Sequence, residues 1–210
     1  MLHGLGRSPA SMRPIERVLS AHGYDVLNLG YPSRSASIVD LARRISSDIA
    51  RWAANDALDF VTHSLGGLLI RQAVADGHLL ADRVHRVVML GPPNAGSELA
   101  DQLPRWPVFG PVYRKFTGPA GLQLGTSPRG VPARLPPVPF ATGVIAGTRS
   151  FNPIFSAVLG GRSDGKVRVE RTYVGGMRDF VEVPYWHPML MMPKSVHALI
   201  LRFLETGTFS

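Results

Sequence analysis

Two kinds of hydrophobic pattern alternate along this chain. Apolar residues at helical spacing, or apolar segments that open on glycine, predict helices over 8–22, 38–52, 65–75 and 195–204. Short continuous apolar runs between turn signals predict strands over 24–29, 58–62, 87–90, 140–146 and 167–174. Because strands and helices alternate, we expect an α/β fold with a mostly parallel central sheet flanked by helices.

One stretch, residues 104–139, departs from this alternation. It contains nine prolines and several glycines, and it is too long for an ordinary connection. We interpret it as an excursion or small cap over the active edge of a single domain that spans 1–210, with a short helix near 112–116. A floppy surface loop is the alternative interpretation.

Composition removes several classes of function. The net charge is +8, but the 23 basic residues are scattered rather than clustered, so no nucleic-acid partner is expected. No apolar run approaches the roughly 18 residues that cross a bilayer. The absence of cysteine excludes disulfides, thiolate metal sites and a cysteine nucleophile. No histidine and carboxylate spacing suggests a metal, and no cofactor is expected.

The N-terminus is unusual for this fold class. Only Met1 and Leu2 precede the loop that begins at His3, so the first strand is shortened. We expect either natural residues upstream of Met1 or a strand borrowed from a partner chain, which would make a dimer. No signal peptide is visible, which favours the cytoplasm from this chain alone and leaves the compartment open.

The most informative segment is THSLG at residues 62–66. It follows an apolar strand and opens a helix, which is the context of a nucleophile elbow, where a sharp turn presents a serine hydroxyl above the sheet. Gly66 meets the steric need for a small residue two positions after Ser64, whereas Thr62 replaces the usual first glycine. A purely structural turn is the alternative.

Two backbone N–H groups are candidates for an oxyanion hole, a pair of donors that stabilises a developing negative charge. The N–H of Leu65 lies at the positive end of the predicted helix. The glycine-bearing loop at 3–6 can aim the N–H of Leu5 at the same point. His3 itself is expected to be structural.

An acid and a histidine should follow the serine along the chain. Asp164 lies in the tight turn at 163–165 and is the preferred acid, with Asp179 and Glu182 as competitors. His187 lies in a loop before the last helix, from which a general base can reach Ser64, whereas His197 lies inside that helix. His63 is too close in sequence to Ser64 to act as its base, because adjacent side chains diverge at such a turn.

These residues together resemble the α/β-hydrolase superfamily, in particular its small bacterial serine lipases and esterases. The matching motifs run along the whole chain: HGL at 3–5, YPS at 31–33, THSLGG at 62–67, GPPNAGS at 91–97, DGKV at 164–167, His187 and FLETGTF at 203–209. The resemblance implies a minimal, N-terminally shortened α/β-hydrolase fold, with Ser64 as nucleophile, His187 as base and Asp164 as orienting acid. It also implies backbone oxyanion donors at Leu5 and Leu65, and supporting or packing roles for Asn94 and Ser97.

The expected function is hydrolysis of carboxylic esters through an acyl-enzyme on Ser64, with a small acyl ester or lipid as substrate. Apolar residues of the 104–139 stretch could line an acyl pocket: Trp106, Phe109, Val112, Tyr113 and Phe116. The alternatives are an acyltransferase or amidase with the same triad, and a non-catalytic binding protein that kept the fold.

Overall fold

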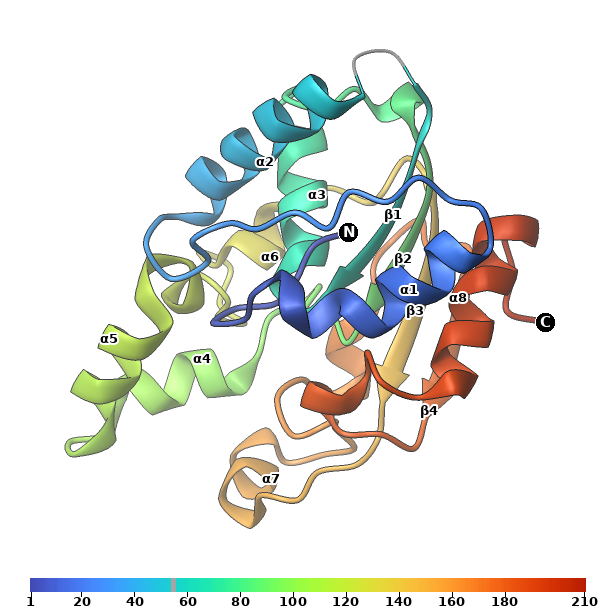
Figure 1. Ribbon diagram of the computed structural model, residues 1–210. Coiled ribbons are helices and arrows are strands. Elements are labelled where there is room, and N and C mark those ends of the chain that lie inside the picture. Colours follow the sequence, from blue (N-terminus) through green and yellow to red (C-terminus); the bar gives the residue numbers. More distant parts are fainter. Residues whose placement is uncertain (54–55) are drawn as a thin grey trace.

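The computed structural model describes residues 1–53 and 56–210 (Figure 1). Four parallel strands form a sheet in the order β1-β2-β3-β4: Leu58–His63, Val84–Leu90, Ala141–Gly147 and Asp179–Val183. The α-helices are α1 Arg13–Ala21, α2 Ile38–Trp52, α3 Leu65–Ala75, α4 Glu98–Gln102, α5 Phe109–Leu122, α6 Val131–Arg134, α7 Pro153–Leu159 and α8 Lys194–Thr206. Five short 3-10 helices complete the order: η1 Pro9–Met12, η2 Ala81–Arg83, η3 Leu103–Arg105, η4 Val169–Thr172 and η5 His187–Met189.

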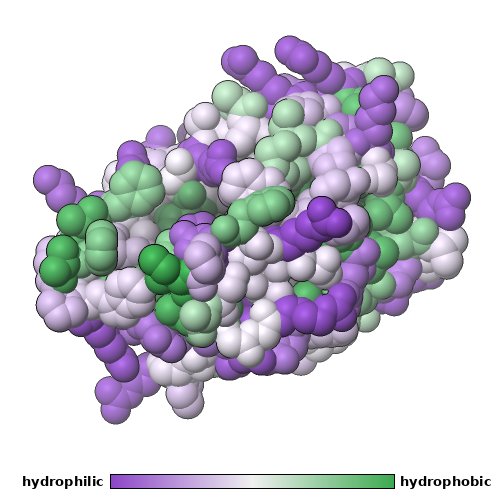
Figure 2. Space-filling view, turned by 90° about the horizontal axis from the view of Figure 1, so that it is seen from below, coloured by the Kyte–Doolittle hydropathy of each residue, from purple (hydrophilic) through white to green (hydrophobic). Residues whose placement is uncertain are grey.

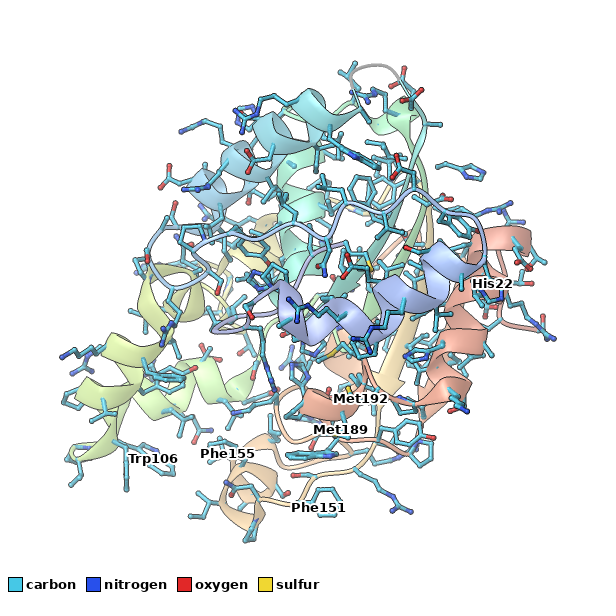
Figure 3. All side chains as sticks on the ribbon, viewed as in Figure 1. His22, Trp106, Phe151, Phe155, Met189 and Met192 are labelled. Atoms are coloured by element: carbon cyan, nitrogen blue, oxygen red, sulfur yellow. The ribbon has the colours of Figure 1, made fainter. Side chains whose placement is uncertain are left out.

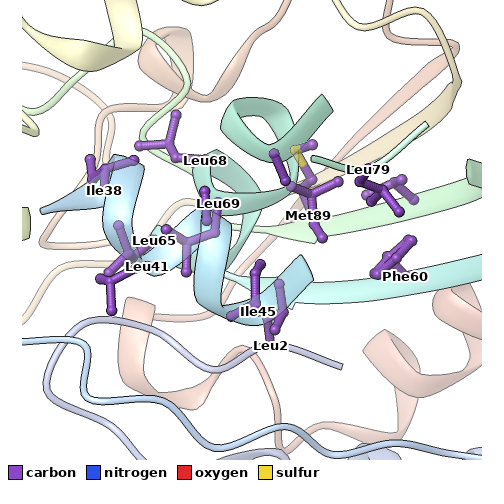
Figure 4. Packing of buried hydrophobic residues seen from close by; sticks show 14 of the residues in the cluster. Leu2, Ile38, Leu41, Ile45, Phe60, Leu65, Leu68, Leu69, Leu79 and Met89 are labelled. Atoms are coloured by element: carbon purple, nitrogen blue, oxygen red, sulfur yellow. The ribbon is translucent and has the colours of Figure 1, made fainter. Parts of the chain in front are cut away.

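The predicted α/β architecture with a parallel sheet is confirmed. Successive residues of each strand point to opposite faces, so each strand serves two cores. In β2, Val87 and Met89 belong to the core under α2 and α3, whereas Val88 and Leu90 belong to the core under α1 and α8. Figure 4 shows the first of these cores, in which leucines of α3 pack between α2 and the sheet.

All four strands end at the same edge of the sheet. His63 pairs with Leu90, Leu90 pairs with Ile145, and Gly147 at the end of β3 pairs with Val183. The loops that leave these ends therefore meet in one place, which is where ligands bind in open parallel sheets. Figure 1 shows α4, α5 and α7 gathered beyond this edge.

The predicted strand at 24–29 is only an extended segment. Leu2 forms parallel bridges with both Leu29 and Thr62, and the N–H of Leu29 donates to the Met1 carbonyl at 3.1 Å. The three residues at 1–3 lie between this segment and β1, so too few pairing partners exist for a ladder. Leu2 is only 1% exposed and packs in the core.

The predicted strand at 167–174 is wrong, and β4 was missed. The valines at 167, 169 and 174 are buried, but the middle of the segment forms the 3-10 helix η4, in which the Thr172 hydroxyl donates to the Val169 carbonyl at 2.6 Å. The fourth strand is instead Asp179–Val183, a half-buried edge strand. Its two acidic residues interrupt the apolar run that would have revealed it.

The segment 104–139 is largely helical rather than a floppy loop. It contains most of η3, all of α5 and all of α6, and α5 is longer than the short helix expected near 112–116. Gly118 adopts φ +64 inside α5, where the chain kinks. Leu99 and Leu103 pack with Leu159 of α7 in a third apolar cluster beyond the sheet edge. Within the described ranges, no helix combines the length and apolar character needed to span a bilayer.

Candidate active site

Ser64 occupies a strained turn between β1 and α3. Its φ is 52° and its ψ is −118°, and among the described residues it is the only one other than glycine with a positive φ. Such a conformation costs roughly 1–3 kcal/mol and persists where surrounding structure enforces it. The Ser64 N–H donates to the Leu90 carbonyl at 2.9 Å, which fixes the turn above the sheet edge. The described part of the chain gives the Ser64 hydroxyl no hydrogen-bond partner.

Close packing explains the small residues around this turn. A Cβ at Gly66 would lie 2.8 Å from the Leu2 carbonyl oxygen, so the first turn of α3 could not approach the N-terminal segment with a larger residue. A Cβ at Gly4 would lie 3.2 Å from the Ser64 Cβ and 2.6 Å from Nδ1 of His63. Thr62 is accommodated within β1, fully buried, beside Leu2.

The structure brings Asp164 and His187 together. Oδ2 of Asp164 accepts a hydrogen bond from Nδ1 of His187 at 2.6 Å, and the His187 N–H donates to the Asp164 carbonyl at 2.8 Å. Oδ1 of Asp164 accepts from the N–H groups of Lys166 and Val167, each at 2.9 Å. Asp164 is 1% exposed and both of its carboxylate oxygens have hydrogen-bond partners, so its orientation is held firmly.

The competing residues lie elsewhere. Asp179 accepts hydrogen bonds from the N–H groups of Phe180 and Phe209, and Glu182 pairs with Arg162. His197 is buried in α8, and its Nε2 contacts the Met191 carbonyl at 2.9 Å. Among the described residues, none of these three forms a hydrogen bond with His187.

His63 lies beside this pair. Its ring centroid is 4.7 Å from that of His187, and it lines the same cavity as Ser64. Nε2 of His63 lies 3.1 Å from the His187 carbonyl, which can only accept, so Nε2 carries the proton. Burial, followed by the proximity of His187, holds the pKa of His63 well below its ordinary value. The neutral ring therefore supports the His187 backbone.

The loop at 3–7 lies beside Ser64 and lines the same cavity. Tyr31 stacks on His3 at 4.1 Å and donates its hydroxyl to the His3 carbonyl, and the Ser33 hydroxyl accepts from the Gly6 N–H at 2.9 Å. His3 is thus structural, as expected. No hydrogen bond within the described residues occupies the N–H groups of Leu5 or Leu65. Both groups remain available to a ligand at the sheet edge.

Buried polar contacts fix the loop that follows β2. Arg71 of α3 donates to the Asn94 carbonyl at 3.0 Å and to the Leu135 carbonyl at 3.1 Å, and burial lowers the pKa of Arg71 to about 10. Asn94 donates to the Thr172 carbonyl, and the Ser97 hydroxyl donates to the Lys166 carbonyl at 2.7 Å. These contacts connect α3 to the loop that holds Asp164. The supporting roles expected for Asn94 and Ser97 fit this placement.

A cavity of about 520 Å³ joins these elements. Ser64, His63 and His187 line its floor, and the loop at 5–7 lines one side. Its remaining walls are mostly apolar and come from α4, α5 and α7. The five apolar residues predicted for an acyl pocket all line it: Trp106, Phe109, Val112, Tyr113 and Phe116. Figure 3 labels Trp106, which follows η3, and Phe155 of α7, both in the lower left part of the view.

The charged residues of this cavity are all basic. Arg7 and Lys166 line it, and Nζ of Lys166 lies 4.5 Å from the centre of the Phe155 ring. Desolvation lowers the pKa of Lys166; the nearby Asp164 opposes this shift, and Arg7 adds to it. No aspartate or glutamate appears among the described lining residues. Nor do the described residues contain a cluster of three acidic or histidine side chains that could hold a metal ion.

Several solved structures are similar to this chain. The lipase BlEst2 of Bacillus licheniformis, in its mature form, is 18% identical with a TM-score of 0.70, over 99% of this chain and 90% of that chain. Phospholipase PlaB from Legionella pneumophila is 17% identical with a TM-score of 0.70, over 98% of this chain and 56% of that chain. Aspergillus fumigatus lipase B is 15% identical with a TM-score of 0.68, over 97% and 51%.

These similarities confirm the predicted fold class and the resemblance to α/β hydrolases. This chain spans only about half of the two longer proteins. No curated protein matches the sequence. The chain belongs to the family described as "Domain of unknown function (DUF7379)", whose model matches residues 7–123.

Sequence reasoning missed three groups that shape the site. The Ser33 hydroxyl accepts a hydrogen bond from the Gly6 N–H, and Arg71 donates one to the Asn94 carbonyl. His63 supports the His187 backbone. The signal for Ser33 was present in the YPS motif at 31–33, but the motif does not show what the hydroxyl contacts. An arginine inside an apolar helix was the signal for Arg71.

Proposed function

We propose that this protein is a serine hydrolase that cleaves carboxylic esters, an esterase or lipase. The observation that carries the proposal is the buried Asp164–His187 pair at the same cavity as Ser64, which occupies the strained turn. In such an arrangement the acid holds the imidazole in the tautomer that leaves Nε2 free to accept a proton. The 1–210 chain acts as one domain, with 104–139 as a small cap over the cavity.

The chemistry follows from the positions of these groups. Ser64 Oγ attacks the acyl carbon while Nε2 of His187 accepts its proton, and the tetrahedral oxyanion accepts hydrogen bonds from the N–H groups of Leu5 and Leu65. His187 then passes its proton to the departing alkoxide, which leaves as the alcohol. A water molecule attacks the acyl-enzyme by the same route, so Ser64 is restored with its proton.

The cavity favours an apolar acyl group. Its walls are aromatic and aliphatic side chains, and its volume of about 520 Å³ lies within the range of small-molecule sites. Burying an acyl chain there contributes roughly 0.8 kcal/mol per methylene group, up to the point where the cavity is filled. We therefore expect kcat/KM to rise with acyl length over the first several carbons and then to level off.

The test uses nitrophenyl esters of increasing acyl length and a fluorophosphonate probe. We expect the natural sequence to hydrolyse the esters and to form one covalent adduct, on Ser64. Ser64→Ala should abolish both, with a loss of about 10³-fold or more in kcat. Ser47→Ala, on the exposed face of α2, is the matched control and should change neither the hydrolysis nor the adduct. A Ser64→Ala protein that hydrolyses the esters at the natural rate would overturn the proposal.

Two other uses of the same groups are distinguished by the same assay. An acyltransferase would give mainly transesterified product when a competing alcohol is added, instead of free acid. A non-catalytic binding protein would leave the probe unreacted, because the adduct requires an activated hydroxyl.

A further inference from the structure

The rim of the cavity carries an unusual concentration of exposed apolar side chains. Nine of the thirteen large apolar side chains that are exposed in the described residues lie in three segments, 108–116, 151–154 and 186–192. Val108, Phe109, Val112 and Phe116 are between 61% and 75% exposed. Each segment borders the cavity, through Phe109, Ile154 and Pro188 respectively. Exposed apolar surface that gathers in this way marks an interaction site.

Figure 2 looks onto this side of the molecule from below. Hydrophobic side chains gather toward the left of the view, the side on which α5 lies, and they surround a hollow. Figure 3 shows Trp106, which precedes α5, and Phe155 and Phe151, which lie in and just before α7, in the lower part of the view. The apolar rim therefore surrounds the opening of the cavity.

Positive charges predominate in this region. The acidic residues of α4, Glu98 and Asp101, lie at its border, and Glu98 is paired with Arg168 and Arg171. Residues 102–163, which contain α5 and α7, include seven arginines or lysines and no aspartate or glutamate. Residues 1–15 and 184–204, which supply the loop at 3–7 and η5, also contain no acidic residue. The chain has 15 acidic residues, so their exclusion from these three segments is a property of this region, not of the composition.

Three cations are tied to the rim by direct contacts. Arg34 lies 5.0 Å from the centre of the Phe116 ring, Lys166 lies over Phe155, and Arg7 lines the cavity. All three are exposed, and none forms an ion pair with a described residue. The rim thus combines apolar side chains that could enter a hydrocarbon layer with cations that remain free to meet anions.

We propose that this rim binds the surface of an anionic lipid bilayer. Apolar side chains partition into the boundary between headgroups and acyl chains, while each cation near such a surface adds to the attraction. The cavity opening would then face the bilayer, so an ester lipid could enter it without crossing water. This inference rests on the proposed function for the identity of the substrate, but the binding itself does not require catalysis.

A second copy of the chain fits this face less well. In a symmetric dimer the same patch faces itself, so Arg7, Arg34 and Lys166 would approach their counterparts with like charge. A nucleic acid would satisfy the cations but would leave Val108 and Phe151 without an apolar partner. An anionic bilayer satisfies both kinds of side chain.

The experiment measures sedimentation of the Ser64→Ala protein with vesicles, so that lipid is not hydrolysed during the measurement. One set contains phosphatidylcholine alone, and the other an equal mixture of phosphatidylcholine and phosphatidylglycerol. We expect binding to the anionic vesicles to be about ten-fold stronger or more, and to weaken at high salt because ions screen the attraction. Equal binding to both sets, or binding to neither, would overturn the inference.

Two sets of variants separate the charges from the apolar side chains. Lys115 is an exposed cation of α5, close in sequence to Phe116. Arg34→Glu combined with Lys115→Glu should weaken anionic binding about ten-fold or more, whereas Arg43→Glu with Arg44→Glu on α2 should have a much smaller effect. Val108→Asp with Phe151→Asp should weaken it similarly, whereas Leu80→Asp, an exposed apolar position next to η2, should not. Equal losses from rim and control variants would contradict the inference.

Competition and size measurements address the other occupants. A DNA oligonucleotide that binds as tightly as the anionic vesicles and does not respond to the Val108 and Phe151 variants would overturn the inference in favour of nucleic acid. A dimer in solution that these variants dissociate would overturn it in favour of a second copy. Hydrolysis of a soluble ester by the variants with Ser64 intact reports on the proposed function separately, because soluble substrates do not need a bilayer.

Discussion

Two regions that share one cavity are built in opposite ways. On the floor, Asp164 and His187 are buried, and every oxygen of the Asp164 carboxylate has a hydrogen-bond partner. On the rim, α5 and α7 expose apolar side chains, and the nearby Arg7, Arg34 and Lys166 form no ion pair with a described residue. The polar groups of the Asp164–His187 pair are buried and hydrogen-bonded, whereas the apolar side chains of the rim are exposed and its cations have no ion-pair partner among the described residues.

The difference has a physical reason. A buried charge is tolerated only when its hydrogen bonds are complete, so the floor is fixed by many contacts from several segments. Exposed apolar side chains contribute little to the stability of the fold. The free energy falls when another apolar phase covers them, so they favour binding. Substitutions on the floor should therefore change turnover, and substitutions on the rim should change binding without changing folding.

The largest expected effect tests the hydrogen bond on the floor. Asp164→Asn keeps the size of the side chain but removes the acceptor that fixes the His187 tautomer, so kcat should fall by about 10⁴-fold. The measurement is kcat for hydrolysis of a nitrophenyl ester. Asp179→Asn is the matched control at one of the two competing acids. If Asp179→Asn shows the large loss and Asp164→Asn does not, the assignment of the acid is wrong.

A second test asks how tightly the floor is packed. Gly91 has φ +53, and a Cβ there would lie 2.9 Å from Oδ2 of Asp164 and 3.0 Å from Nδ1 of His187. Gly91→Ala should therefore displace the pair and lower kcat about 100-fold. Gly77 has φ +71 but no atom within 4 Å of its Cβ, so Gly77→Ala shares the backbone strain without the contact. Equal activities for the two variants would show that the pair tolerates displacement.

The pH dependence of stability tests the buried histidine beside the floor. Burial and the proximity of His187 hold the pKa of His63 well below its ordinary value, so the unfolded chain binds a proton at His63 that the folded chain does not. The free energy of unfolding should thus fall as pH decreases below about 6.5, by up to about 1.4 kcal/mol per pH unit for this group. Above that pH its contribution is complete.

Urea unfolding between pH 5 and pH 7 measures this slope. His63→Gln, which retains a donor for the His187 carbonyl, should reduce the slope relative to the natural sequence, because glutamine does not titrate. The remaining slope should include His3, whose pKa burial also lowers. An identical slope in both proteins would contradict the account of His63.

The smallest effect is expected on the rim. Val108 is 75% exposed, so Val108→Ser should change the free energy of unfolding by no more than about 0.5 kcal/mol. Leu103, five residues earlier in the chain, is buried with Leu99 and Leu159 and is the contrasting position. Leu103→Ala should cost about 2–5 kcal/mol. Thermal unfolding measures both, and a large loss from Val108→Ser would show that the rim is part of the core.

Local rules were sufficient where a single segment determines its own structure. The period of apolar residues predicted α2 and α8, and the strand–turn–helix pattern around Ser64 predicted the start of α3 at Leu65. The order of serine, acid and histidine also indicated Asp164 and His187 before any contact was known. The structure brings these two into contact, while their catalytic roles stay predictions.

Partners distant in the sequence decided the rest. The segment at 24–29 has strand-like composition but too few neighbours to pair with, and 167–174 buries its valines without a strand partner. Asp179–Val183 becomes a strand because β3 offers it a free edge. The sequence by itself determined α1, α2, α3 and α8, the strands β1 to β3 and the identities of the candidate residues, because each depends on side chains a few positions apart. The tertiary structure decided which histidine contacts which acid, which residues support that pair and which charges lie around the cavity. These features depend on contacts between segments far apart in the sequence, and sequence separation does not show which segments lie close together in space.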